Sequence, residues 1–259
     1  MTDGPLSGCR ILVTRPSSQA ATLCEAIREA GGEPVSFPVL RIVPKSAADV
    51  AADLATVPNP DVAIFVSRNA VLHGLAHVND TGATLAAVGP ATADAIRAAG
   101  ARVDVVPADG ADSERLLAEP AFADVSGRNI LIVRGETGRE LLGDTLQKRG
   151  ATVHYLPVYR REPVALPESE VDVVATALGH GDIDFVIVLS IETMRNLLAL
   201  LPATGDDLLR KTTLVAPGER VIQGACELVP GMATCRASGP GASDVVRAMI
   251  DHRLTGQNQ

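Results

Sequence analysis

The amino-acid sequence predicts an α/β protein with two parallel-sheet domains. Short apolar runs rich in β-branched residues alternate with amphipathic segments along most of the chain, a pattern typical of parallel strands linked by helices. Residues 11–41 and 130–160 align without a gap, and each copy reads as strand, helix, strand. A chain of 259 residues, 46% of them hydrophobic, is sufficient for two substantial cores.

Each copy of the repeat begins with a strand and a helix. ILVT at residues 11–14 and ILIV at residues 130–133 are short β-branched runs, suited to strands buried on both faces of a parallel sheet. In the first copy Leu23 and Ile27 lie on one helical stripe, and Gly31 follows where a helix C-cap favours positive φ. The second copy has leucine, leucine and glycine at the same three positions.

The segments between and after the copies follow the same plan. Apolar runs at residues 62–66, 84–88 and 103–106 read as strands. The last third of the chain resembles this middle section more weakly, and the similarity predicts strands at 185–189 and 214–216. Neither copy of the repeat has enough strands for its own sheet, so each must join one of these segments. The sequence permits either pairing.

The connectors favour a crossed pairing. Pro38–Pro44 and Pro157–Pro163 are similar extended phrases at the ends of the two copies. They read as two strands that run between domains, and two passages between domains require one of the domains to be discontinuous.

Composition excludes several classes of protein. A formal net charge of −8 with 2% aromatic residues and no Trp provides neither the basic surface nor the stacking platforms of a nucleic-acid binder. No apolar run approaches the roughly 18 residues of a membrane span, and MTDGPLSG lacks the features of a signal peptide. We therefore expect a cytoplasmic protein that binds neither nucleic acid nor membranes.

Metal and disulfide chemistry also lack support. The four cysteines form no CxxC pair and fall in or beside predicted strands and helices, where reduced thiols are usual. His73 and His77 share a helix face, but no HExxH motif and no obvious third ligand accompany them. We expect no metal, and no grouping of Ser, His and Asp with a nucleophile elbow is found.

Small or hydroxyl residues recur where a predicted strand ends and a helix begins. The carboxyl ends of parallel strands face the binding crevice, and helix N-termini present N–H groups to anions, so these positions suit a carboxylate-rich ligand. Helix capping alone fully explains a single serine such as Ser67, Ser113 or Ser190. There is no GxGxxG or GxxxxGK[ST] motif to support a nucleotide cofactor. The candidate binding residues of this kind are Ser67, Asn69, Gly89, Thr92, Ser113, Gly135 and Ser190.

Four arginines stand at or just beyond the same strand ends: Arg15, Arg68, Arg134 and Arg139. Guanidinium groups recognise carboxylates, so all four are candidate ligand-binding residues. Arg15 and Arg134 share one position in the repeat, which is explained equally well by a structural ion pair. Arg139 is expected on a solvated surface.

Tyr159 is one of only two tyrosines and replaces Leu40 of the first copy on a predicted connector. Its phenol could face the interdomain cleft and give or take a hydrogen bond. Packing is the equal alternative.

Taken together, these motifs resemble the uroporphyrinogen-III synthase family along the whole chain. The residues that carry the resemblance are ILVTRP (11–16), PVLRI (38–42), FVSRNAV (65–71), AVGPATA (87–93), Ser113-Glu114, IVRGETGRELL (132–142), LPVYRR (156–161) and Ser190.

The resemblance implies two flavodoxin-like domains joined by a two-stranded linker, with a discontinuous first domain. It places domain 1 at residues 1–38 and 164–259, domain 2 at 45–157 and the linker strands at 39–44 and 158–163.

The resemblance also implies a hydro-lyase of haem and sirohaem biosynthesis that needs neither a metal nor an organic cofactor. Its substrate, hydroxymethylbilane, loses its terminal hydroxyl, closes through a spiro intermediate and emerges as uroporphyrinogen III with the last ring inverted. By match to the family's connector tyrosine, Tyr159 is the expected donor to the departing hydroxyl. We further expect a monomer that makes transient contact with the preceding pathway enzyme.

Two rival functions share parts of this pattern. A hinged, non-enzymatic binding protein would have the same architecture, but the lack of a signal peptide argues against a periplasmic receptor. An NAD-linked enzyme lacks its glycine motif.

Overall fold

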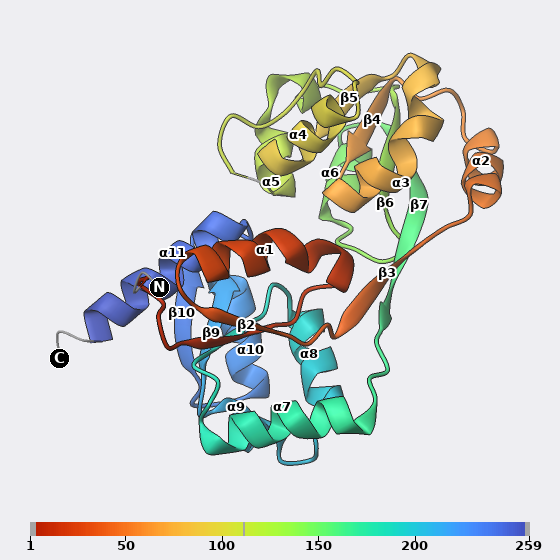
Figure 1. Cartoon of the computed structure of the whole chain (residues 1–259). Helices are drawn as coiled ribbons and strands as arrows, with labels where there is room; N and C mark the ends of the chain where they lie inside the picture. Colours follow the sequence, from red (N-terminus) through yellow and green to blue (C-terminus); the bar gives the residue numbers. More distant parts are fainter. Residues whose placement is uncertain (1–3, 111, 257–259) are drawn as a thin grey trace. The chain divides into compact units, whose positions relative to one another are not determined.

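The computed structural model describes residues 4–110 and 112–256. The chain forms two compact units (Figure 1), called unit 1 (Met1–Arg41 with Glu162–Gln259) and unit 2 (Ile42–Arg161). Unit 1 is therefore discontinuous. The chain passes between the units at Arg41–Ile42 and at Arg161–Glu162, inside the segments that the sequence assigns to the linker.

Unit 1 is built on a five-stranded parallel sheet of order β10-β9-β8-β1-β2. In chain order this is 2-1-3-4-5, the flavodoxin arrangement. Its strands are β1 (Arg10–Val13), β2 (Glu33–Ser36), β8 (Phe185–Ile187), β9 (Thr213–Pro217) and β10 (Ala233–Ala237). Its helices are α1 (Ser17–Glu29), α7 (Glu168–His180), α8 (Ile191–Leu200), α9 (Gly205–Leu209), α10 (Glu219–Leu228) and α11 (Ala242–Gly256).

Both faces of this sheet are covered by helices. Successive residues of a strand point to opposite faces: Leu12 packs with α7, α8, α9 and α10, whereas Ile11 and Val13 pack with α1 and α11. Figure 1 shows α1 and α7 on opposite sides of the strands. This explains why the strand carries no polar alternation in the sequence.

Unit 2 has a sheet of order β3-β7-β6-β4-β5. A parallel bridge between Ala86 and Val105 extends it beyond β5, and the strand predicted at residues 103–106 is reduced to that bridge. Its strands are β3 (Leu40–Pro44), β4 (Val62–Phe65), β5 (Thr84–Ala87), β6 (Asn129–Gly135) and β7 (Thr152–Pro163). Its helices are α2 (Ala47–Ala55), α3 (Arg68–Val78), α4 (Pro90–Ala98), α5 (Ser113–Ala118) and α6 (Leu141–Lys148), with 3-10 turns η1 (Asn79–Thr81) and η2 (Pro120–Phe122).

The two sheets share one spatial plan. The order β10-β9-β8-β1-β2 corresponds, position by position, to Val105-β5-β4-β6-β7. Even the register agrees, because Ile11 pairs with Phe185 as the equivalent Ile130 pairs with Val62. The first copy of the repeat therefore joins the last segment of the chain and the second copy joins the middle one, which is the crossed pairing.

The linker is a short antiparallel ladder between β3 and β7. The Lys45 N–H donates to the Val158 carbonyl at 3.0 Å, and the Val164 N–H donates to the Val39 carbonyl at 3.3 Å. Arg41 and Glu162 form an ion pair at 2.7 Å across the same ladder. The predicted fold class, two parallel α/β units joined by a two-stranded linker, is confirmed.

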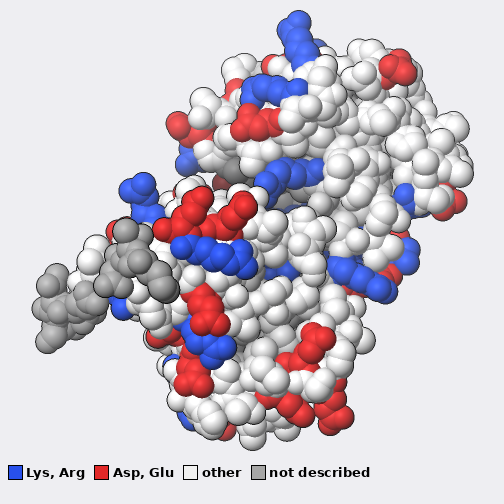
Figure 2. Space-filling model, viewed as in Figure 1, with Lys and Arg blue, Asp and Glu red and all other residues white. Residues whose placement is uncertain are grey.

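Acidic and basic side chains are interspersed on the face drawn in Figure 2, where several blue groups touch red ones. In the part of the chain that the structure describes, no helix combines the length and the apolar character needed to cross a membrane.

Candidate functional site

The sequence-predicted site residues of unit 2 come from the carboxyl ends of neighbouring parallel strands. Ser67 follows β4, Gly89 follows β5, Gly135 ends β6, and Tyr159 lies in β7 beside it. Because β4, β5, β6 and β7 run parallel, these residues share one edge of the sheet.

Ser67 is the N-cap of α3. Its backbone is extended, with φ of −165°, and its Oγ accepts a hydrogen bond from the Ala70 N–H at 3.1 Å. The same Oγ lies 3.2 Å from the phenol oxygen of Tyr159. The capping alternative is therefore correct for Ser67, and the serine has a second polar neighbour that capping does not require.

Tyr159 is 2% exposed, and its ring packs in a core cluster of unit 2. The strand pairing of β6 and β7 shifts register between Arg134 and Gly135, so Gly135 pairs with Tyr159. The ring then lies against Gly135, where a Cβ atom would come within 2.9 Å of Cε2 and Cζ. The ring of Tyr159 is therefore packed in the core, as the packing alternative expects. Its hydroxyl reaches the half-buried Ser67 at the sheet edge.

His73 of α3 lies beside the phenol, with ring centroids 6.3 Å apart and the planes tilted by 51°. Burial lowers the pKa of His73, which favours the neutral imidazole next to the tyrosine. The guanidinium of Arg161 lies 6.0 Å from the centre of the Tyr159 ring.

Arg134 is held inside its own unit. Its side chain is buried, with Nη2 3.1 Å from the Glu140 carboxylate, Nε 3.3 Å from the Gly135 carbonyl, and the guanidinium 4.8 Å from the centre of the Tyr155 ring. The hydrogen bond from Arg134, followed by that from Tyr155, holds the pKa of Glu140 below its ordinary value. Burial, followed by the hydrogen bond to Glu140, raises the pKa of Tyr155 to about 12. The structural ion pair considered for Arg134 is present.

Arg139 is exposed and pairs with Glu114 at 2.8 Å, as a solvated surface residue would. Arg68, the first residue of α3, is also exposed, and Asn69 is half-buried. These two side chains stand at the helix start that Ser67 caps.

Gly89 and Thr92 form the start of α4. Gly89 is the extended N-cap, with φ of −175°, and its carbonyl accepts the Thr92 N–H at 3.1 Å. Both residues are buried.

Ser113 does not cap α5. Asp112 is the N-cap and accepts the Arg115 N–H at 2.8 Å, which makes Ser113 the first helical residue. Aspartate and serine are comparable N-cap residues, and the helix begins at Ser113 itself, so the cap position falls on Asp112.

Two predicted site residues, Arg15 and Ser190, lie in unit 1. Arg15 is buried, and its guanidinium donates to the Pro240 carbonyl in the loop before α11. Ser190 caps α8, accepting the Thr193 N–H at 3.1 Å, with the Thr193 hydroxyl 2.8 Å away. Each residue stands at the carboxyl end of its parallel strand, as predicted.

Sequence reasoning missed Tyr155 and Glu140, which fix Arg134. The available signal was Tyr155 itself, the second tyrosine, which replaces Ser36 of the first copy. A bulky aromatic at a strand position held by serine in the other copy indicates a contact specific to one unit.

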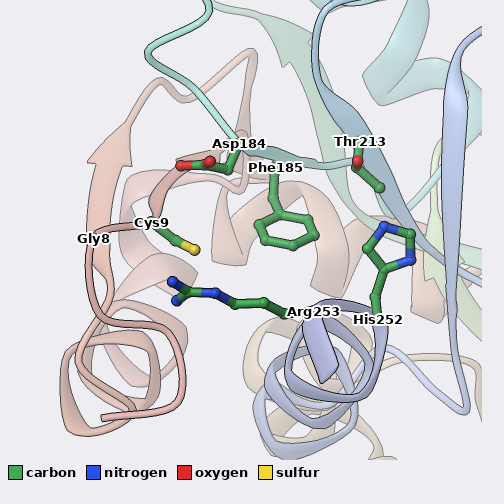
Figure 3. Close-up of a pocket in the computed structure, with 7 residues that line it drawn as sticks. All are labelled: Gly8, Cys9, Asp184, Phe185, Thr213, His252 and Arg253. Carbon is green, nitrogen blue, oxygen red and sulfur yellow. The ribbon is translucent and has the colours of Figure 1, made fainter. Parts of the chain in front are cut away.

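A cavity of ≈ 380 Å³ lies elsewhere in unit 1 (Figure 3), at the amino-terminal ends of β1, β8 and β9. Cys9, Phe185, His252 and Arg253 point towards it, and Gly8, Asp184 and Thr213 complete its lining. None of the predicted site residues lines this cavity. Among the described residues there is also no cluster of three or more His, Cys, Asp or Glu arranged to hold a metal ion.

Comparison with known proteins decides the family. The family model described as uroporphyrinogen-III synthase HemD matches residues 21–228. The chain belongs to the uroporphyrinogen-III synthase family. It is 31% identical over 199 residues to uroporphyrinogen-III synthase of Escherichia coli, which covers 74% of this chain and 80% of that protein. It is 29% identical over 211 residues to the Synechococcus elongatus enzyme, covering 78% of both.

Solved structures support the fold assignment. A mutant uroporphyrinogen-III synthase from Thermus thermophilus aligns with a TM-score of 0.64 and 18% identity, over 97% of this chain and 100% of that one. The Helicobacter pylori protein aligns with a TM-score of 0.63 and 17% identity, over 95% and 99%. The uroporphyrinogen-III synthase fold thus accounts for nearly the whole chain.

Proposed function

We propose that this protein cyclises hydroxymethylbilane to uroporphyrinogen III in haem and sirohaem biosynthesis, with inversion of the last pyrrole ring. The observation that carries the proposal is the family match across residues 21–228. Ser67, Gly135 and Tyr159 lie together at one sheet edge, and this is where we place the proton donor of the reaction.

The reaction begins with the loss of the terminal hydroxyl. The carbon–oxygen bond breaks with its electron pair on oxygen, which takes the phenol proton of Tyr159 and leaves as water. The adjacent pyrrole N–H then loses its proton, which gives a neutral azafulvene, and a proton from solvent restores the phenol. General acid catalysis of this kind contributes about 10²–10⁴-fold to a rate.

Ring closure requires the enzyme to hold the linear substrate in a folded conformation, more than it requires further catalytic groups. The substituted carbon of the last pyrrole attacks the azafulvene carbon and forms a spiro intermediate. The bond between the substituted carbon of the last pyrrole and its original bridge carbon then breaks. The bridge carbon bonds instead to the unsubstituted α-carbon of the same ring, and loss of a proton from that position restores the pyrrole. Holding one geometry and stabilising developing charge are sufficient for these steps.

Carboxylates of the substrate are proposed to bind at the strand ends and helix starts. Arg68 and Asn69 at the start of α3, with the backbone of Gly89 and Thr92 at α4, are the candidate contacts in unit 2. Ser190 at α8 is the counterpart in unit 1. N–H groups at a helix start favour an anion without a large basic surface, which agrees with the acidic net charge of the chain.

Arg15, Arg134, Arg139, Ser113 and Gly135 were predicted as substrate contacts too, and the structure gives most of them other partners. Arg134 and Arg139 pair with glutamates, and Gly135 makes room for the Tyr159 ring. We propose that they act mainly by shaping the site.

We further propose a hydro-lyase that acts without a metal or organic cofactor, as a cytoplasmic monomer with transient contact to the enzyme that delivers its short-lived substrate. The linker at residues 39–44 and 158–163 is proposed as the connection between domains 1–38 with 164–259 and 45–157. Size-exclusion chromatography with light scattering tests the monomer.

The product isomer tests the function itself. The protein is mixed with freshly prepared hydroxymethylbilane, the product is oxidised, and the porphyrin isomers are separated. Type III in excess over the spontaneous type I product supports the proposal. Type I alone refutes it.

A further inference from the structure

The hydroxyl of Ser67 has two polar neighbours and uses them differently. Its Oγ accepts the Ala70 N–H at 3.1 Å and lies 3.2 Å from the Tyr159 phenol oxygen. A serine hydroxyl has one hydrogen and two lone pairs. The helix cap occupies a lone pair, so the hydrogen of Ser67 remains available for the tyrosine.

The direction of this second hydrogen bond decides what the phenol can do. If Tyr159 donated to Ser67, the phenol hydrogen would be engaged away from the substrate. If Ser67 donates, the phenol hydrogen stays available, and the phenol oxygen accepts a hydrogen bond that stabilises its negative charge once the proton has left. The positive end of the α3 dipole, which begins next to Ser67, acts in the same sense.

We propose that Ser67 is a positioning residue for Tyr159. Its hydroxyl hydrogen is donated to the phenol oxygen, which fixes the phenol and directs the phenol hydrogen to the departing hydroxyl of the substrate. This inference rests on the proposed function, in which Tyr159 is the proton donor. It assigns Ser67 a role different from the direct substrate contact predicted from the sequence.

The surroundings hold the two hydroxyls together. The Tyr159 ring lies against Gly135 on one side, where no side chain intervenes, and beside His73 on another. Ser67 is fixed by its cap on α3, an eleven-residue helix that packs in the same core cluster as the tyrosine. A donor held by a regular helix keeps its geometry better than one on a mobile loop.

A double-mutant cycle tests the inference in the full chain with hydroxymethylbilane. Ser67→Ala is expected to lower kcat about fivefold, the loss of one hydrogen bond, without raising KM. In the Tyr159→Phe background the same change is expected to lower kcat no further, because Ser67 then has no phenol to position. Ser67→Thr, which keeps a hydroxyl, is expected to restore most of the rate.

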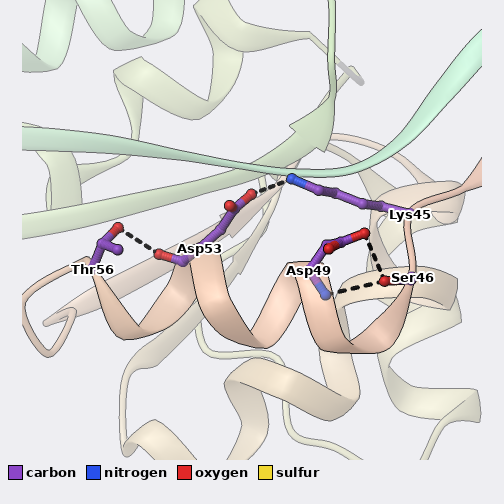
Figure 4. Close-up of polar contacts among 5 residues, drawn as sticks. All are labelled: Lys45, Ser46, Asp49, Asp53 and Thr56. Atoms are coloured by element: carbon purple, nitrogen blue, oxygen red, sulfur yellow. Dashed lines mark hydrogen bonds and ion pairs between the residues drawn. The ribbon is translucent and has the colours of Figure 1, made fainter.

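Two controls separate positioning from helix capping. Ser67→Gly removes the hydroxyl at a small capping cost, and its kcat is expected to match that of Ser67→Ala. Ser46 caps α2 by accepting the Asp49 N–H at 3.1 Å (Figure 4), the same cap distance as at Ser67. Ser46→Ala therefore removes a cap of the same kind from a serine whose hydroxyl is bonded to Asp49 and not to Tyr159, and its kcat is expected to equal that of the wild type.

Three outcomes overturn the inference while the proposed function stands. The first is a Ser67→Ala variant with the kcat of the wild type. The second is a loss of equal size in the wild-type and Tyr159→Phe backgrounds, which would make the effect of Ser67 independent of the phenol. The third is a raised KM, which would make Ser67 a direct substrate contact. Failure of the proposed function is distinct, since the wild-type protein itself would then yield type I alone, and the inference would fall with it.

Discussion

The ring of Tyr159 lies directly against Gly135 at the end of β6 and occupies the position that a side chain on residue 135 would need. A Cβ atom on residue 135 would lie 2.9 Å from two ring carbons and 3.3 Å from the phenol oxygen. The glycine is needed here because of a neighbouring side chain, and the register shift between β6 and β7 brings the two residues together.

Gly135→Ala is therefore expected to displace the phenol. Because small misplacements of a catalytic group are costly, the rate of type III formation should fall about tenfold or more. Gly179→Ala in α7 is the control, since its Cβ would meet only Leu208 Cδ2, at an ordinary 3.6 Å. An alanine at position 135 with the wild-type rate would contradict this account of the site.

The two arginines at and after the end of β6 should differ in their effect on stability. Arg134→Met removes a buried guanidinium, its ion pair with the exposed Glu140 and a carbonyl hydrogen bond, and is expected to lower the free energy of unfolding by about 1–3 kcal/mol. Arg139→Met removes an exposed pair with Glu114 and should cost at most about 1 kcal/mol. Urea unfolding measures both, and the reverse ranking would show that Arg134 is not a structural residue.

Tyr155 should titrate later than an ordinary phenol. Its pKa is raised from 10.0 to about 12, so the stabilisation from its neutral form is complete below pH 10 and is lost as the pH rises towards 12. A rapid pH jump, followed by tyrosinate absorbance before unfolding, should show a step near pH 12 that Tyr155→Phe abolishes. A folded protein in which the Tyr155 phenol titrates like an ordinary one would contradict the contacts of Tyr155 with Glu140 and Arg134.

Thiol accessibility gives a test of the packing of unit 1, which contains all four cysteines. All four cysteines are free; Cys226 is half-buried, and the other three are buried. Burial raises the pKa of Cys9, with a further contribution from Asp184, and burial followed by Asp251 raises the pKa of Cys235 to about 11.

A thiol reagent at neutral pH is therefore expected to modify Cys226 first and the other cysteines only after unfolding. The Cys226→Ser variant should lose the early phase. Rapid reaction of Cys9 or Cys235 in the native protein would be inconsistent with this packing.

The fold could be predicted because the chain repeats its own plan. The alignment of residues 11–41 with 130–160, and of Phe185 with Val62, is also the register of the two sheets. Apolar strands buried on both faces leave a strong signal in the sequence. The strand expected at residues 103–106 is the exception, since it makes only a single bridge.

The partners of the candidate residues were harder to predict. Whether Arg134 meets a ligand or Glu140 depends on the path of the loop between β6 and α6, which has no periodicity in the sequence. The burial of the Tyr159 ring depends on one register shift, and the choice of Asp112 over Ser113 as cap depends on where a six-residue helix begins. Local geometry of this kind is not determined by hydrophobic pattern.

The most direct test of the central claim is the rate at which Tyr159→Phe converts hydroxymethylbilane to the type III isomer. The variant keeps the ring that packs against Gly135 and loses only the hydroxyl. We predict a rate about ten- to a hundredfold below that of the wild type, with type III still formed because the substrate's own carboxylates can supply the proton. A variant that retains the full rate would contradict the role of Tyr159 as the donor to the departing hydroxyl.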